Sequence, residues 1–152
     1  MSRQRNSRVS PVVAEASEEA ELALESYGKN LGIAFQLSDD VIDYASDSET
    51  MGKGVGDDFR DGKMTLPVIL AYARGSEGER AFWRAAIGGD RVSDEDLAEA
   101  IRLLRSTEAL TDTLERARQY ARRAIDALAM FPSGKAKSAL AEAAEFAVSR
   151  AY

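Results

Sequence analysis

Apolar residues recur three and four positions apart along most of the chain, which is the spacing of one face of an α-helix. Alternating β-branched residues, which mark half-buried strands, are nearly absent, and Ala, Leu, Glu and Arg dominate the sequence. These residue types favour helices. The pattern therefore predicts an all-α fold of about six to seven helices with no sheet.

Capping residues and helix breakers set the predicted boundaries. Ser76 and Glu79 have the spacing of a capping box, and Ser93 precedes another acidic first turn. No internal repeat or linker interrupts the chain, so we expect a single domain over residues 12–152. The predicted helices are a short one beginning at Ser10 and Pro11, then 17–45, 65–74, 80–87, 93–105, 107–130 and a last one after 132–134 reaching 152, with a Gly/Asp loop over 47–63.

One stripe of small and apolar residues follows the predicted helix over 107–130. Its spacing predicts a face that packs in the core. A hydrophobic content of 45% in 152 residues is enough for one such core. The stripe consists of Leu110, Leu114, Ala117, Ala121, Ala124 and Leu128.

Histidine and cysteine are both absent from the sequence. A disulfide framework, a zinc finger, a thiol nucleophile, a Ser-His-Asp triad and a histidine general base are therefore excluded. Any acid-base or metal chemistry must come from carboxylates, lysines, tyrosines and backbone groups.

The charge is unevenly distributed, with 20 basic and 26 acidic residues and a net charge of −6. Arg3, Arg5 and Arg8 lie in a segment without acids, so we expect residues 1–11 to form a disordered basic tail on an acidic body. An acidic body disfavours nucleic acid as a partner. No apolar run approaches the roughly 20 residues of a transmembrane helix. The absence of cysteine fits a cytoplasmic protein.

Acidic residues gather on one side of the helix predicted over 17–45. On a helical wheel, five polar residues fall within an arc of about 100° that also holds Gly32. The remaining circumference is apolar except for Ser38, so we expect this helix to be buried with its acidic stripe facing a narrow opening. The five residues are Gln36, Asp39, Asp40, Asp43 and Asp47.

Crowded carboxylates repel one another unless protons or a cation neutralise them. Aspartate is also a poor helix former, so it is a costly choice for an inert exposed face. Its short carboxylate suits hard cations, and Mg²⁺ typically takes one or two carboxylates together with phosphate oxygens. A magnesium site and a merely solvated acidic face are the two interpretations of this stripe.

Glycines and lysines follow in the predicted loop, where Gly52, Gly54 and Gly56 surround Lys53 and Gly62 precedes Lys63. Glycine lets backbone N–H groups approach an anion, and lysine supplies a charge for phosphate, although such a loop is also typical of a simple turn. The spacing matches neither a Walker A loop nor an EF-hand. Beside the aspartates, these residues indicate a site for magnesium and a diphosphate.

Two segments resemble a known family. Residues 32–44, GIAFQLSDDVIDY, are similar to the second aspartate-rich motif of the trans-isoprenyl (polyprenyl) diphosphate synthases. Residues 51–67, MGKGVGDDFRDGKMTLP, resemble the segment that follows it in octaprenyl, solanesyl and decaprenyl diphosphate synthases. The resemblance implies the C-terminal part of an isoprenoid-synthase helical bundle built around a central cavity.

The resemblance also implies a prenyltransferase reaction. Mg²⁺ would bridge two aspartate-rich motifs to an allylic diphosphate, and the double bond of isopentenyl diphosphate would attack the resulting carbocation. By resemblance, Asp39 would be a direct metal ligand, and Asp40 and Asp43 would complete the set directly or through water.

The other candidate site residues come from the same resemblance. Lys53 and Lys63 would hold the allylic diphosphate and stabilise it as it leaves, as fixed cations do for developing negative charge. Phe35 and Gln36 would line the cavity near the carbocation.

The sequence departs from the family pattern upstream of Gly32. The first aspartate-rich motif, its paired arginines, an upstream Lys-Thr pair and the basic residues for isopentenyl diphosphate have no counterparts there. Asp57–Asp61 has the spacing of the first motif but lies at the loop position and lacks the arginines. Smaller departures are Gly54, where long-chain members commonly have proline, and Met64 before the threonine. The resemblance therefore covers residues 12–152 and the C-terminal half of the fold.

Three functions are consistent with these observations. The first is the C-terminal half of a prenyl diphosphate synthase, completed by a homo-oligomer or by a partner that supplies the missing half. The second is a non-catalytic binding or regulatory subunit, or a decayed paralogue, that associates with a full-length synthase. The third is an unrelated helical domain. Half of a bundle should expose apolar faces, so the first two predict association.

Overall fold

The computed structural model describes residues 17–45, 55–89 and 92–151. These residues form seven helices and no strand, which confirms the predicted all-α fold. The helix predicted at Ser10 and Pro11 lies outside the described residues, and no described helix is long and apolar enough to cross a membrane. The helices are α2 (Glu18–Ala45), α3 (Asp57–Arg60), α4 (Leu66–Arg74), α5 (Glu77–Gly88), α6 (Asp94–Ser106), α7 (Ala109–Ala127) and α8 (Lys135–Ser149).

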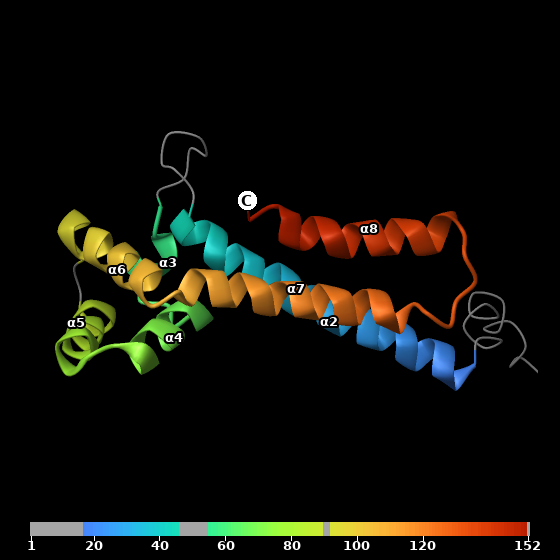
Figure 1. Ribbon diagram of the computed structural model, residues 1–152, viewed down its shortest axis with the longest axis horizontal. Helices are drawn as coiled ribbons and strands as arrows, with labels where there is room; N and C mark the ends of the chain where they lie inside the picture. The colour runs from blue at the N-terminus through green and yellow to red at the C-terminus, as the bar shows by residue number, and fades with distance from the viewer. Residues whose placement is uncertain (1–16, 46–54, 90–91, 152) are drawn as a thin grey trace, which may run out of the picture.

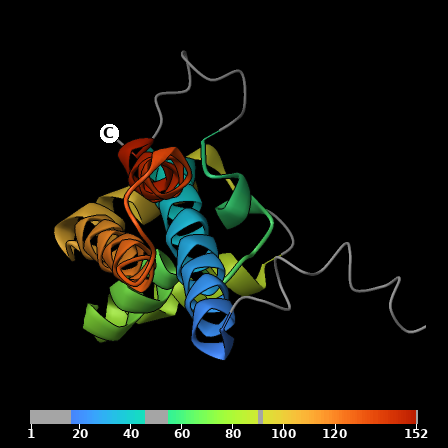
Figure 2. The same ribbon diagram turned by 90° about the vertical axis from the view of Figure 1, so that its right-hand side faces the viewer.

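The three long helices α2, α7 and α8 run along the long axis, and the shorter helices gather at one end (Figure 1). The end-on view separates the three long helices and shows that each lies beside the other two (Figure 2). α7 runs antiparallel to α2, and α8 runs back parallel to α2. This direction brings the end of α8 toward the C-terminal half of α2.

Small residues of α7 allow this close packing. Five of the six residues in the predicted stripe are buried, and Leu110 is partly buried, so the predicted core face is confirmed. Ala121 and Ala124 lie against Ala34 and Tyr27 of α2 and Ala144 of α8. The hydroxyl of Tyr27 donates to the carbonyl of Leu140 at 2.7 Å and ties α2 to α8.

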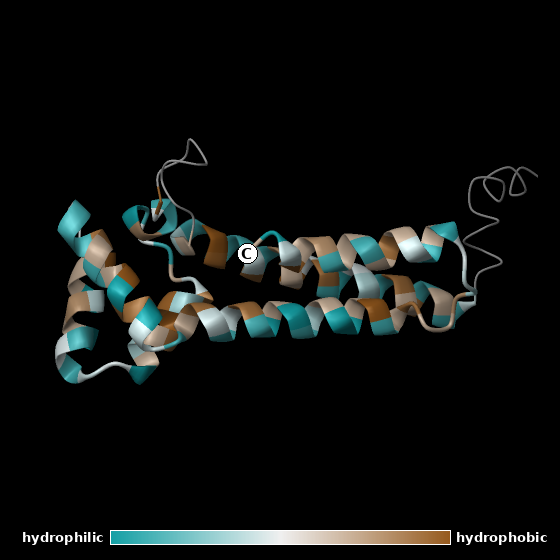
Figure 3. Ribbon diagram, turned by 45° about the horizontal axis from the view of Figure 1, so that its top comes forward, coloured by the Kyte–Doolittle hydropathy of each residue, from teal (hydrophilic) through white to brown (hydrophobic). Residues whose placement is uncertain are grey.

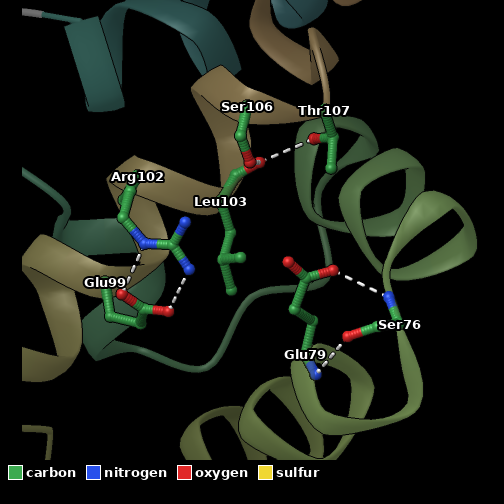
Figure 4. Close-up of polar contacts among 7 residues, drawn as sticks. All are labelled: Ser76, Glu79, Glu99, Arg102, Leu103, Ser106 and Thr107. Atoms are coloured by element: carbon green, nitrogen blue, oxygen red, sulfur yellow. Dashed lines mark hydrogen bonds and ion pairs between the residues drawn. The ribbon is translucent and has the colours of Figure 1, made fainter.

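A second core cluster holds the short helices together. Trp83 of α5, Phe59 of α3 and Leu103 of α6 are almost fully buried there, together with Tyr44 from the end of α2. Both sequence-predicted caps are present: the side chains of Ser76 and Ser93 accept from backbone N–H groups three residues on. Figure 4 shows the reciprocal Ser76–Glu79 pair.

Two of the differences from the predicted boundaries have a clear local cause. Residues 57–60 form the single-turn helix α3 inside the expected loop, because the buried Phe59 ring anchors this turn. The helix expected from about 107 begins at Ala109, because the Thr107 hydroxyl donates to the Leu103 carbonyl at 2.7 Å and so belongs to the end of α6 (Figure 4).

α2 is less buried than its composition predicted. Phe35 remains 46% exposed, and Leu22 and Leu24 are also exposed. Each long helix carries both hydrophilic and hydrophobic residues along its length, and the apolar ones are not all covered by the other two helices (Figure 3). The described helices therefore leave part of an apolar surface of α2 open.

Candidate functional site

The aspartates predicted to bind metal lie on the last turns of α2, next to α3 and the end of α8. Asp39 has a side chain that is 42% exposed, whereas Asp40 is buried and Asp43 is half-buried. Asp39 is therefore the most accessible of the three carboxylates. Lys53 and Asp47 lie outside the described residues.

Asp43 connects α2 to the segment that follows it. Its backbone carbonyl accepts from the Gly56 N–H at 2.9 Å, and its carboxylate accepts from the Asp58 N–H at 3.2 Å. Gly56 has a φ of 81°, and a Cβ there would meet the Leu97 side chain at 2.3 Å. The left-handed backbone and the close packing together require glycine at this position.

This geometry corrects one interpretation of the loop glycines. The N–H groups of Gly56 and Gly62 both donate to backbone carbonyls, those of Asp43 and Phe59, at 2.9 and 3.1 Å. They are therefore used inside the protein and do not form an anion cradle. Gly52 and Gly54 lie outside the described residues.

The surroundings of Asp40 and Asp43 disfavour their charged forms. Burial, followed by the nearby Asp58 carboxylate, raises the pKa of Asp43 to about 6. Burial also raises the pKa of Asp40, although the Gln36 amide donates to its carboxylate at 3.0 Å and acts in the opposite direction. Both carboxylates would be stabilised in their charged forms by a nearby cation.

Lys63 is held near these aspartates by an ion pair with Asp58. Its ammonium is 3.2 Å from the Asp58 carboxylate, and its backbone N–H donates to the Asp58 carbonyl at 2.9 Å. The charge of Lys63 opposes the upward pKa shifts of Asp40 and Asp43. The lysine predicted to bind diphosphate is thus near the aspartates, held by a residue that the sequence did not single out.

A second residue missed from the sequence is Arg150. Its guanidinium Nη2 donates to the Asp39 carboxylate at 2.9 Å and lies over the Phe35 ring, 4.1 Å from the centroid. The contact joins two residues that are 111 positions apart. In the sequence, Arg150 is only a basic residue near the end of a predicted helix. That position does not indicate which residue its side chain contacts.

Asp39, Asp40 and Asp43 are the described residues that could offer oxygen ligands to a metal ion, and they would need a ligand to complete its coordination. Within residues 17–45, 55–89 and 92–151, no group of three or more acidic side chains is arranged to hold a metal by itself. Asp39, Asp40 and Asp43 offer hard oxygen atoms and excess negative charge from one helix. Mg²⁺ commonly takes one or two carboxylates and completes its octahedron with water and phosphate oxygens.

Comparison with known proteins agrees with the sequence motifs. Residues 5–104 match the polyprenyl synthetase family model. The chain is 39% identical to octaprenyl diphosphate synthase of Haemophilus influenzae over 93% of its own length and 43% of that protein. It is 39% identical to a short chain isoprenyl diphosphate synthase of Methanothermobacter thermautotrophicus, over 86% of the chain and 39% of the relative.

Solved structures give the same result for the fold. A polyprenyl synthase from Caulobacter crescentus, crystallised with calcium and isoprenyl diphosphate, superposes with a TM-score of 0.83 at 48% identity over 93% of this chain. A decaprenyl diphosphate synthase from Rhodobacter capsulatus gives 0.84 at 39% identity over 95%. This chain covers 43% and 44% of those two proteins. It spans less than half the length of the relatives it matches.

Proposed function

The chain belongs to the polyprenyl synthetase family, and we propose that it supplies half of a prenyltransferase site, the half that binds magnesium and an allylic diphosphate. The complete reaction would be the head-to-tail condensation of that diphosphate with isopentenyl diphosphate. The observation that carries the proposal is the convergence of Asp39, Asp40, Asp43 and Lys63 at the end of α2.

Asp39 and its neighbours are suited to hold a divalent cation. The relative from Caulobacter crescentus was crystallised with calcium and isoprenyl diphosphate, which supports binding of a cation and a diphosphate by a protein of this fold. Magnesium, when bound, would neutralise the carboxylates and the diphosphate and favour departure of the diphosphate. In the proposed site Asp39 is the most accessible ligand. Asp40 and Asp43 are less exposed and complete the ligand set directly or through water.

Lys63 would bind the diphosphate oxygens directly. The Lys63 side chain is 61% exposed and its ammonium pairs with Asp58, so the ammonium can contact a ligand at the protein surface. A fixed cation at this position stabilises negative charge that grows on the leaving group. Lys53 is assigned the same role from the motif, and Phe35 and Gln36 are proposed to line the cavity beside the allylic carbon.

In this proposal the second half of the site would come from another polypeptide segment. The sequence holds no counterpart of the first aspartate-rich motif, and Phe35 and Leu24 on α2 are exposed. We propose that a homo-oligomer or a partner with the missing half covers this apolar surface. If the chain instead acts as a non-catalytic subunit, the same surface would bind a full-length synthase.

Titration calorimetry with a non-hydrolysable allylic diphosphate analogue tests the proposal. Binding should require Mg²⁺ and should weaken at least about tenfold in Asp39→Asn, which removes one ligand charge. Asp126→Asn, an exposed aspartate of α7, is the matched control and should bind like the wild type. Absence of Mg²⁺-dependent binding would contradict the half-site and favour the non-catalytic subunit.

A further inference from the structure

Arg150 forms an ion pair with Asp39, the most accessible carboxylate of the aspartate-rich motif. Its guanidinium is 2.9 Å from the Asp39 carboxylate, and its side chain is 24% exposed. Within the described part of the chain, neither Asp40 nor Asp43 forms such an ion pair with a basic side chain. The cationic group therefore lies at the carboxylate that is most open to a metal ion.

We infer that Arg150 is an internal counter-cation for Asp39 and that its ion pair and metal binding at Asp39 exclude each other. Arg150 would hold the carboxylate in the metal-free protein and leave it when a divalent ion with its diphosphate arrives. This inference rests on the proposed function, because it concerns the same metal site.

The contacts of Arg150 make it a replaceable partner. Its Nε atom is buried and finds no hydrogen-bond acceptor among the described atoms, so the side chain is incompletely satisfied where it lies. The Phe35 ring stabilises the guanidinium through its face, but this contact is weak at a partly exposed site. On leaving Asp39 the guanidinium would become fully hydrated, and this hydration would offset part of the free energy lost with the ion pair.

Release of Arg150 does not require α8 to unfold. The neighbouring Val148 and Ala151 pack against a cluster that includes Val41 and Leu114, and these contacts hold the backbone at the end of α8. We therefore expect rotation of the Arg150 side chain alone to free Asp39. The Arg150 side chain thus moves while the backbone of α8 stays in place, and we call this exchange of partners at Asp39 the latch.

Mn²⁺ binding followed by electron paramagnetic resonance of the free ion tests this inference, with the full chain and the allylic diphosphate analogue present. Arg150→Met should bind Mn²⁺ about three- to tenfold more tightly than the wild type, because the competing cation is gone. Arg150→Lys, which keeps the charge, should lie between the two. Arg123→Met is the control, since Arg123 also lies over an aromatic ring, that of Tyr120, at 4.9 Å.

The outcomes separate this inference from the proposed function. Loss of Mn²⁺ binding in Asp39→Asn with equal affinity in wild type and Arg150→Met overturns the latch and leaves the metal site standing. Weaker binding in Arg150→Met also overturns it. Failure of both the wild type and Arg150→Met to bind overturns both proposals, whereas binding by Arg150→Met alone supports the latch.

A direct readout is the ¹⁵N–¹H signal of the Arg150 Nε group. It should shift in the wild type when Mg²⁺ and the analogue are added, because the guanidinium leaves Asp39 and the Phe35 ring. The signal of Arg123 should stay in place. An Arg150 signal that does not move while the metal binds would contradict mutual exclusion.

Discussion

Phe59 lies edge-on to Trp83, with ring centroids 6.0 Å apart and an angle of 84° between the ring planes. Both side chains are almost fully buried, so this contact fixes the single turn of α3 on the core. The turn carries Asp58, which donates its N–H to Asp43 and pairs with Lys63. An aromatic pair far from the solvent therefore positions the charged residues of the proposed site.

Phe59→Ala should destabilise the chain by about 3–5 kcal/mol, the usual cost of removing a buried aromatic ring. The fluorescence of Trp83, the single tryptophan, reports unfolding in urea. Phe146→Ala is the control, because Phe146 is 65% exposed and its loss should change the free energy of unfolding by less than about 0.5 kcal/mol. Equal effects in the two variants would contradict the described core.

Gly56→Ala should destabilise the chain by more than about 1 kcal/mol, because alanine would need a positive φ and its Cβ would collide with Leu97. Gly28→Ala offers the opposite case. Gly28 lies within α2 and has open space around its Cβ position, so alanine should stabilise the isolated chain by about 0.5–1 kcal/mol. Thermal unfolding should show a lower melting temperature for Gly56→Ala and a higher one for Gly28→Ala than for the wild type.

The raised pKa of Asp43 predicts that stability falls as the pH rises from about 4 to about 6. The folded protein holds its proton over this range while the unfolded chain has lost it, so the stabilisation is complete below pH 4 and lost above pH 6. The change should be about 1–2 kcal/mol, because the carboxylate is only half-buried. Urea denaturation across this range should show it, and Asp43→Asn should flatten the dependence. A wild-type stability that rises from pH 4 to 6 would contradict the prediction.

Lys63→Gln should weaken Mg²⁺-dependent binding of the allylic diphosphate analogue about tenfold, because a charge-assisted contact to phosphate is lost. The melting temperature should hardly change, since Lys63 is exposed and its ion pair with Asp58 is screened by water. Lys135→Gln, at the start of α8, is the matched control for removal of a surface lysine. Calorimetry of the three proteins separates binding from folding.

Local chemistry made most of the fold predictable. The capping boxes at Ser76 and Ser93 set two helix starts, and the α7 stripe identified the core face, because both signals depend on neighbours within a few residues. The boundary at Thr107 was missed since its hydroxyl can serve either adjoining helix, and structure alone shows that it bonds backward to Leu103.

The sequence pointed to the aspartates of the proposed site and to Lys63, but not to Arg150. Asp39, Asp40 and Asp43 follow from helical spacing, whereas Arg150 reaches Asp39 because α8 runs parallel to α2. Nothing in the local sequence encodes that direction. The position of Asp58 likewise depends on how the turn of α3 packs, through Phe59, against Trp83.

The distance along the chain between Asp39 and Arg150 also sets an order of events during synthesis. Asp39 and Arg150 are 111 residues apart, so the ribosome makes the acidic helix first and its arginine partner on the order of ten seconds later. Until then the aspartates of the nascent chain carry their charge without that arginine. The ion pair at Asp39 can therefore form only after α8 has been synthesised and packs on α2.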